Sequence, residues 1–201
     1  IDLDGSDSKQ WTPIGTVEKP YRGIFDGNGH TISGLKCTSS AETGLFGAVH
    51  VGAEIHNLII GEDCEFTCTG NYNEGVAGIV GKVDIGWDWG YVRIENCANY
   101  GKVIAPSTAN AGGILGLVNN STSDNVKVHV SNCYNMGTIT AGNKNGALLC
   151  GYMRNSGVIS NCWAYSMLTS SPGNIPYDTT QGRPEFFAGY FGTIDIQNCY
   201  A

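Results

Sequence analysis

Charged residues are scarce in this chain of 201 residues, in which Asp, Glu, Lys and Arg make up only 14%. The scarcity excludes a charge-rich disordered tail, because 41% of the residues are apolar. Positive charge is the rarer sign: 11 Lys and Arg stand against 18 Asp and Glu, the formal net charge is −7, and no basic run exceeds two residues. We therefore expect no nucleic-acid partner, since such binding needs a basic patch.

Long apolar runs and prolines are also lacking. No apolar run approaches the eighteen or so residues that a membrane-spanning helix needs, so we expect no membrane insertion. Six prolines exclude a collagen-like chain or a proline-rich linker. The chain begins at Ile1 without Met or a leader and ends at Ala201 in the middle of a repeat. We expect residues 1–201 to be one segment of a larger protein.

The 29 glycines mark an internal repeat. A small–Gly–apolar–apolar–Gly segment recurs, as in Gly44-Leu45-Phe46-Gly47. Its closing glycines are separated by 34, 35, 35 and 41 residues and are Gly47, Gly81, Gly116, Gly151 and Gly192. Repeats of this length are typical of arrays in which each unit packs on the next.

A second segment, Ile/Val-x-Asn-Cys/Leu, recurs in phase with the first, and its asparagines are Asn57, Asn96, Asn132, Asn161 and Asn198. A third apolar segment follows it, so each repeat offers three short strands between Gly and Asn turns. A sandwich would not need the same residue at the same phase, whereas stacked rungs do. We predict an all-β fold, a right-handed parallel β-helix (β-solenoid) of about five to six rungs of three short strands. Residues 1–22 would cover the first rung, with Trp11 and Ile14 packed on it, and residues 23–201 would form the repeats.

Four of the eight cysteines follow these asparagines: Cys97, Cys133, Cys162 and Cys199. We predict that they form a column of buried, reduced thiols, since a free cysteine behaves as a small apolar residue. A metal site would need closely spaced ligand pairs. Only Cys64 and Cys68 are so spaced, and they could form a local disulfide or one ligand pair. We therefore expect no metal and no cofactor.

The repeats resemble the glycine-rich GLUG motif, whose consensus Val130-Ser131-Asn132-Cys133-Tyr134-Asn135-Met136-Gly137-Thr138-Ile139 matches almost fully. The resemblance runs from about Trp11 to Ala201. It implies a β-helix module of large secreted or surface-anchored bacterial proteins, often described as adhesins, and hence an extracytoplasmic location. The chain departs from the motif after Asn161, where the glycine is missing, and in a long insertion from Thr169 to Glu185.

The β-helix architecture also includes polysaccharide lyases and hydrolases. Alternate strand positions face outward, which places Glu54, Arg93 and His129 together on one face. The simpler interpretation is a cross-strand ion pair between Glu54 and Arg93. The alternative is a catalytic patch, which lacks a repeated carboxylate pair. Asp26 and His30 could be a catalytic pair, but they flank an Asn-Gly turn signal and are interpreted as turn residues. We therefore predict that the chain is not an enzyme.

Two neighbouring repeats carry extra residues between the closing glycine and the next Ile or Val: 13 and 14 residues, against 8, 8 and 4 in the others. Insertions at one phase of a solenoid emerge at one edge. Aromatic rings beside amides suit a glycan, so the predicted ligand-binding residues are Trp87, Asp88, Trp89, Asn119, Asn120 and Asp124. A slightly favoured alternative is that both tryptophans fold back as packing.

Three functions follow from these patterns. The first is a non-catalytic surface or secreted module that binds a host or dietary glycan or a surface protein. The second is a β-helix polysaccharide lyase or hydrolase, and the third is a passive stalk that displays another domain. An uncovered last rung exposes strand edges, so we also expect end-to-end self-association.

Overall fold

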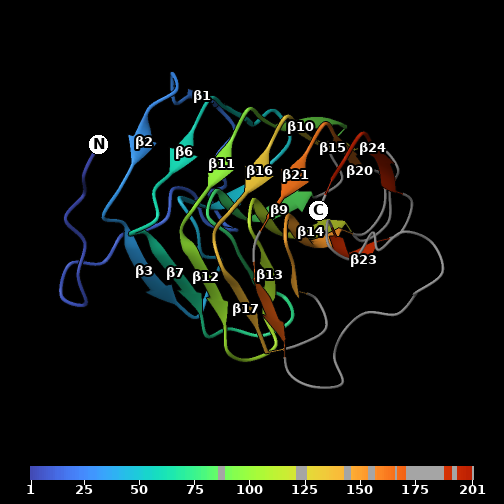
Figure 1. Ribbon diagram of the computed structural model, residues 1–201. Helices are drawn as coiled ribbons and strands as arrows, with labels where there is room; N and C mark the ends of the chain where they lie inside the picture. The colour runs from blue at the N-terminus through green and yellow to red at the C-terminus, as the bar shows by residue number, and fades with distance from the viewer. Residues whose placement is uncertain are drawn as a thin grey trace.

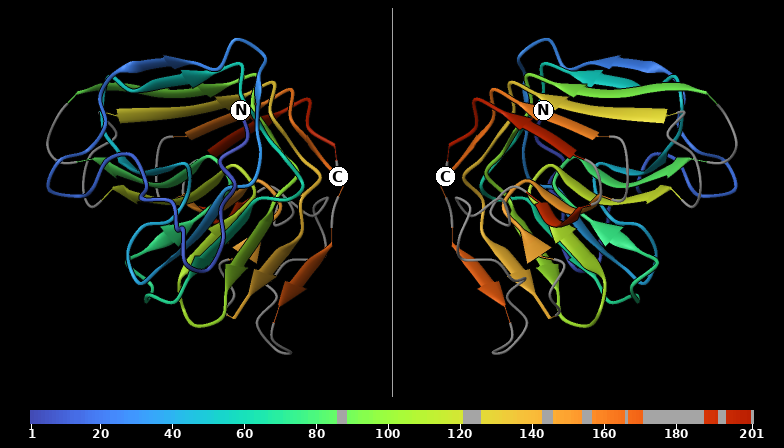
Figure 2. Two further views of the ribbon diagram at one scale, coloured as in Figure 1. Left: turned by 90° about the vertical axis from the view of Figure 1, so that its left-hand side faces the viewer. Right: turned by 90° about the vertical axis from the view of Figure 1, so that its right-hand side faces the viewer.

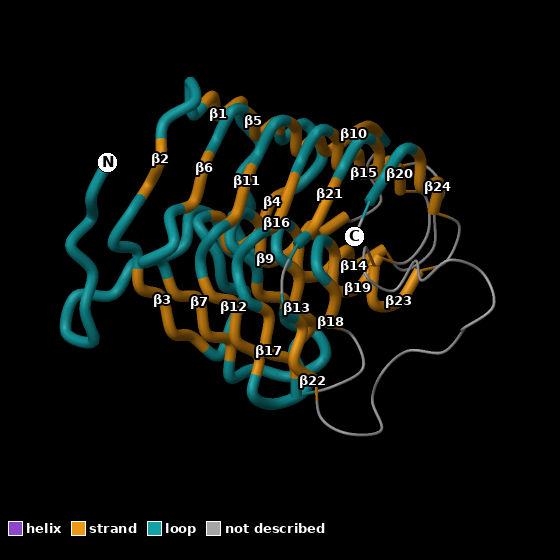
Figure 3. The backbone as a smooth tube through the Cα atoms, in the orientation of Figure 1, coloured by secondary structure: helices purple, strands orange, loops and turns teal. Residues whose placement is uncertain are grey.

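The computed structural model describes residues 1–85, 89–120, 126–142, 146–153, 157–165, 167–170, 188–191 and 194–200. These residues form strands, turns and loops and contain no helix (Figures 1 and 3). None of them lies in a helix long and apolar enough to cross a membrane. The strands form five sheets, and every pairing between strands is parallel. This confirms the predicted all-β class.

Two sheets carry the Ile/Val-x-Asn-Cys/Leu segments and the residues that follow them. The first sheet has the order β1 (Ile24–Asp26), β5 (Glu54–His56), β10 (Gly90–Glu95), β15 (Val126–Ser131), β20 (Gly157–Ser160) and β24 (Ile194–Gln197). The second has the order β2 (Thr31–Ile32), β6 (Ile59–Ile60), β11 (Ala98–Asn99), β16 (Tyr134–Asn135) and β21 (Trp163–Ala164).

Three further sheets complete the arrangement. The third contains β3 (Lys36–Ser39), β7 (Glu65–Cys68), β12 (Lys102–Ala105), β17 (Ile139–Ala141) and β22 (Leu168–Ser170). The fourth contains β8 (Gly75–Val76), β13 (Asn110–Gly112) and β18 (Gly146–Ala147). The fifth contains β4 (Phe46–Val49), β9 (Val80–Ile85), β14 (Leu115–Asn120), β19 (Cys150–Met153) and β23 (Ala188–Phe191).

The chain passes through these sheets in turn and then returns to the first sheet, and we call one such passage a coil. Neighbouring strands of a sheet come from successive coils, so the coils overlie one another when viewed along their direction of advance (Figure 2). The arrangement is consistent with a β-helix or solenoid. Full coils contain five short strands, not the expected three. The fourth sheet was missed because its strands are two or three residues long and rich in glycine and alanine.

The core consists of columns of like side chains that point inward from successive coils. One such column contains Ile55, Ile94, Val130 and Ile159, which are aligned in register and have no exposed surface. Phe46 and Phe66 are likewise fully buried on the fifth and third sheets. Burial of large apolar side chains contributes roughly 1.5–3 kcal/mol each, and the repeat spacing brings them into line.

The recurring asparagines form the corner between the first and second sheets. All five adopt left-handed backbone conformations, with φ between 51° and 57°. Neighbouring side chains also bond along the column: the Asn96 Nδ2 donates to the Asn57 Oδ1 at 3.2 Å, and the Asn198 Nδ2 donates to the Asn161 Oδ1 at 3.2 Å. Asparagine tolerates this left-handed conformation, and its amide makes these two bonds, which explains why it recurs at the corner.

All eight cysteines are free thiols. Cys97, Cys133 and Cys162 are fully buried, as predicted, but Cys199 is only partly buried because it belongs to the last described coil. The backbone N–H of Cys133 donates to the Cys162 Sγ at 3.4 Å, which shows that the column is continuous.

Cys64 and Cys68 form no disulfide and occupy different surroundings. The Cys64 thiol donates to the Ile32 carbonyl at 3.4 Å, and the Cys68 thiol donates to the Ala41 carbonyl at 3.2 Å. Within the described part of the chain, no group of three or more His, Cys, Asp or Glu side chains could hold a metal ion.

Residues 1–22 lie against the first coil without forming a named strand. Isolated parallel bridges join Ile14 to Phe46 and Tyr21 to Val49. The side chains of Trp11 and Ile14 pack against the core, and the Trp11 indole N–H donates to the Leu45 carbonyl at 3.1 Å. This segment therefore covers apolar surface that the first coil would otherwise expose.

Candidate functional site

Both sequence insertions leave and rejoin the coils at the same edge of the molecule. Strand β9 pairs with β14, which aligns Asp84 with Asn119 where the two strands end. Strand β10 pairs with β15, which aligns Tyr91 with Lys127 where the chain returns. The connections β9–β10 and β14–β15 therefore begin side by side and finish side by side, as the equal phase of the insertions predicts.

The predicted binding residues fall into two groups. Asn119 and Asn120 end β14 at this edge, and Trp89 lies directly before β10. Trp87, Asp88 and Asp124 lie outside the described residues. The Trp89 side chain is 76% exposed, so the interpretation that it folds back as packing is wrong for this residue. An exposed tryptophan is unusual, because burying such a ring is strongly favourable.

Beside Trp89, the outer face of the first sheet carries a connected group of side chains. Tyr91 is 51% exposed, and its ring meets that of His129 edge to face with centroids 5.6 Å apart. The Arg93 guanidinium carbon lies 5.3 Å from the centroid of the Tyr91 ring. The Arg93 Nη1 donates to the Glu54 Oε1 at 2.9 Å, which confirms the predicted ion pair.

Burial lowers the pKa of His129, and the positive charges of Arg93 and Lys127 lower it further. Its ring is therefore neutral at pH 7 and keeps one acceptor nitrogen. The His129 Nε2 is buried and has no hydrogen-bond partner among the described residues. Because this atom is buried, a ligand that carries a hydroxyl group can bond to it only if the side chains that cover it move.

The alternative catalytic patch is contiguous, because register aligns Glu54, Arg93 and His129 on adjacent strands. The bonding within it does not favour acid–base chemistry, however. One oxygen of the Glu54 carboxylate is already engaged by the Arg93 guanidinium, so the patch presents no free carboxylate pair. The other carboxylate of this column, Asp195, is aligned with Val158 on the last strand of the sheet, and β10, β15 and β20 separate it from Glu54.

The Asp26–His30 stretch is a turn, as interpreted from the sequence. Asn28 and Gly29 both have positive φ values, 49° and 72°. The Asp26 carboxylate accepts bonds from the Asn57 side chain and the Asn28 backbone N–H, which lower its pKa. Its histidine neighbour is His56, with 3.8 Å between the Asp26 Oδ1 and the His56 Nδ1.

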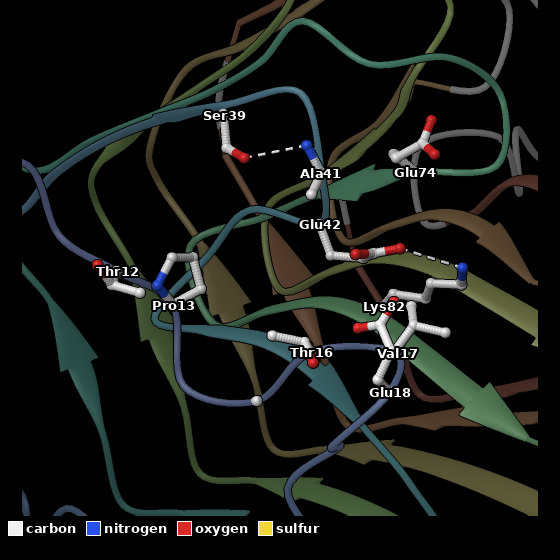
Figure 4. Close-up of a pocket in the computed structure, with 11 residues that line it drawn as sticks. Thr12, Pro13, Thr16, Val17, Glu18, Ser39, Ala41, Glu42, Glu74 and Lys82 are labelled. Carbon is white, nitrogen blue, oxygen red and sulfur yellow. Dashed lines mark hydrogen bonds and ion pairs between the residues drawn. The ribbon is translucent and has the colours of Figure 1, made fainter.

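A separate pocket of about 520 Å³ lies between the N-terminal segment and the first two coils (Figure 4). Lys82 and Glu42 point toward each other inside it, with 3.1 Å between the Lys82 Nζ and the Glu42 Oε1. Both side chains are nearly buried, at 7% and 11% exposure. Sequence reasoning missed this pocket, although Glu42 and Glu74 precede equivalent segments of neighbouring repeats.

The residues of this pocket connect the N-terminal segment to the first coils. The Glu42 carboxylate is occupied by Lys82, and Thr16, Val17 and Glu18 of the N-terminal segment lie beside the lysine (Figure 4). Hydrogen bonds from its own backbone N–H and from Thr16 lower the pKa of Glu18. Lys82 thus lies between Glu42 of the first coil and the N-terminal segment, an arrangement that favours attachment of this segment.

Comparison of the chain with protein-family models, curated proteins and solved structures finds no match. The evidence for function is therefore the geometry itself.

Proposed function

We propose that this chain is a right-handed parallel β-helix module of the GLUG type, and that it belongs to a cell-surface or secreted protein. Its function is non-catalytic binding of a glycan at the edge formed by the two insertions, in the manner of an adhesin. Register stacking of like residues over successive coils supports the fold. The resemblance of the repeats to the GLUG motif supports the location.

The observation that carries the binding proposal is the exposed Trp89 beside the half-exposed Tyr91. Tyr91 lies in β10 and is paired there with Lys127 of β15, and Trp89 directly precedes this strand. Rings placed in this way can pack against the apolar face of a sugar at a small entropic cost. Loops and strand ends on a rigid scaffold are the usual locations of binding sites.

The polar groups around the two rings complete a site of this chemistry. The His129 Nε2 has no partner in the described structure, and Lys127 is exposed next to Tyr91. A sugar offers hydroxyl groups that can bond to the exposed Lys127, and one that can bond to the His129 Nε2 once the side chains over this buried atom move. We refer to Trp89, Tyr91, Lys127 and His129 as the edge site. A surface protein that presents an aromatic-binding pocket would use the same residues.

A glycan array probed with the native chain tests this proposal, together with a reducing-sugar assay on each bound glycan. Trp89→Ala should abolish array binding without changing the unfolding midpoint. Tyr72→Ala is the matched control, because Tyr72 is similarly exposed, at 69%, and lies in the turn between β7 and β8. Release of reducing sugar would favour the enzyme alternative, and absence of both signals would favour the passive stalk.

A further inference from the structure

The outer face of the second sheet carries a second exposed apolar surface, independent of the edge site. Its members come from the last described coils and face solvent beside one another. We call this surface the aromatic face and define it as Tyr134, Met136, Trp163, Tyr165, Met167 and Tyr200. Tyr165, Met167 and Tyr200 are the most exposed, at 79%, 70% and 74%. Figure 1 looks onto β11, β16 and β21, which lie side by side at this surface.

Register explains why these side chains adjoin. Tyr134 is aligned with Trp163, and Trp163 forms a bridge to Tyr200, so one column contains three aromatic residues. Two positions along the chain, Met136 and Tyr165 form a parallel column, because Asn135 pairs with Ala164. The earlier coils present Thr31 and Ile59 in the first column, so the aromatic character is confined to the later coils.

The ring packing argues against a sugar as the occupant. The Tyr134 and Trp163 rings stack with centroids 4.6 Å apart and an angle of 8° between their planes. Tyr100 meets Tyr134 edge to face, and their hydroxyl groups are 3.0 Å apart. One face of the Tyr134 ring and one face of the Trp163 ring are therefore used within the column. A sugar packs on a ring face, whereas another protein surface can pack on ring edges and on methionine.

Among the described residues, none of the members of the aromatic face is charged. The sequence has no Asp, Glu, Lys or Arg between His129 and Lys144, and none between Arg154 and Asp178. The chain as a whole carries a net charge of −7, so this face is where two copies can meet without opposing like charges. Enrichment in Tyr, Trp and Met with depletion of charge is typical of the core of a protein–protein interface.

The border of the face is polar, as the rim of an interface is. On the side of the first sheet, the face is flanked by the corner asparagines Asn132, Asn161 and Asn198. On the side of the third sheet, Thr138 and Lys102 are exposed. In a two-fold dimer the same surface of each copy faces the other. An apolar centre with an uncharged or weakly charged rim can therefore pack against its own copy.

We propose that the aromatic face binds a second copy of this chain in a two-fold dimer. A large aromatic side chain offers about 150–250 Å², so the exposed fractions amount to roughly 600 Å² per copy and about 1,200 Å² per pair, within the range of specific interfaces. Charge at this face could not select one foreign protein over another, whereas binding of a second copy requires no selection by charge. Such a dimer differs from end-to-end association, which would use the strand edges of the last coil.

Sedimentation velocity over micromolar to millimolar concentrations tests the proposal. We expect the native chain to reach a dimer and to stop there. The variant Tyr165→Lys with Met167→Lys should raise the dimer dissociation constant at least about thirtyfold, because two anchors are lost and like charges then oppose one another. Both positions are well exposed, so folding should be unchanged, and far-ultraviolet circular dichroism checks this.

Two further variants make the result specific. Tyr165→Ser with Met167→Ser should also weaken the dimer, which separates the loss of apolar contact from charge repulsion. Tyr72→Lys is the matched control, since Tyr72 is an equally exposed tyrosine of another surface, and it should leave the dimer intact. A native chain that stays monomeric, or a dimer that survives both face variants or dissociates with the control, would overturn the proposal.

Discussion

The corner asparagines allow the backbone geometry to be tested at a single position. Asn96 has a φ of 52°, is exposed, and donates one side-chain bond to Asn57. We predict that Asn96→Gly is more stable than Asn96→Ala. Glycine adopts positive φ without a steric cost, whereas alanine has a Cβ that clashes and no polar group that compensates.

The magnitudes follow from two separate contributions. Alanine in the left-handed region costs about 1–2 kcal/mol, and loss of an exposed ladder bond costs about 0.5 kcal/mol, so Asn96→Ala should cost about 2 kcal/mol. Asn96→Gly loses the same bond and increases the freedom of the unfolded chain, for a total of about 1 kcal/mol. Glycine should therefore be better than alanine by about 1 kcal/mol.

Urea denaturation followed by circular dichroism measures these differences as shifts of the midpoint. Glu95 provides the control, because it precedes Asn96 and lies in a regular strand. At Glu95 the order should reverse, with alanine better than glycine by about 0.5–1 kcal/mol. If alanine were as stable as glycine at Asn96, the left-handed corner would not exist in solution, and the explanation of the repeated asparagines would fail.

Three further results are expected from the thiols, the buried ion pair and the pH dependence. In a thiol titration of the native chain, only the partly buried Cys199 should react readily, and all eight cysteines should react after unfolding; disulfides in a non-reducing digest would refute the thiol column. Lys82→Met should cost about 3 kcal/mol in a urea titration by stranding the Glu42 carboxylate, and Lys82→Met with Glu42→Met should cost less than the single change. Because folding lowers the pKa of His129 below its usual 6.5, the unfolded chain binds more protons in that range. Stability should therefore fall as pH drops through about 6.5 toward the lower folded pKa, and His129→Gln should reduce this slope.

The class of fold could be predicted because each coil of a solenoid needs the same type of residue at the same position. A corner that needs positive φ selects asparagine in each coil, and an inward position selects Cys or Leu, so phase alone identified Asn96 and Cys97. The edge could be predicted for the same reason, since equal phase places the insertions together. The exposure of Trp89 could not be predicted, because a tryptophan near a turn can either pack inward or face solvent.

Features that depend on contacts between different repeats were missed. The bond from the Asn99 amide to the Asn135 Oδ1, 2.8 Å long, is fully buried, yet nothing in a single repeat distinguishes these asparagines from turn residues. The Lys82–Glu42 pair joins residues 40 positions apart on successive coils. The fourth sheet escaped notice because glycine and alanine carry little strand preference.

The central claim is that the edge site binds a ligand through Trp89. Isothermal titration of the strongest array glycan against native chain, Trp89→Ala and Tyr72→Ala measures this directly, with unfolding midpoints recorded for all three. We predict that Trp89→Ala loses detectable binding while its free energy of unfolding stays within about 0.5 kcal/mol of the native value, as for an exposed surface residue, and that Tyr72→Ala binds normally. Native affinity in Trp89→Ala, or a large loss of stability on replacing this exposed ring, would contradict it.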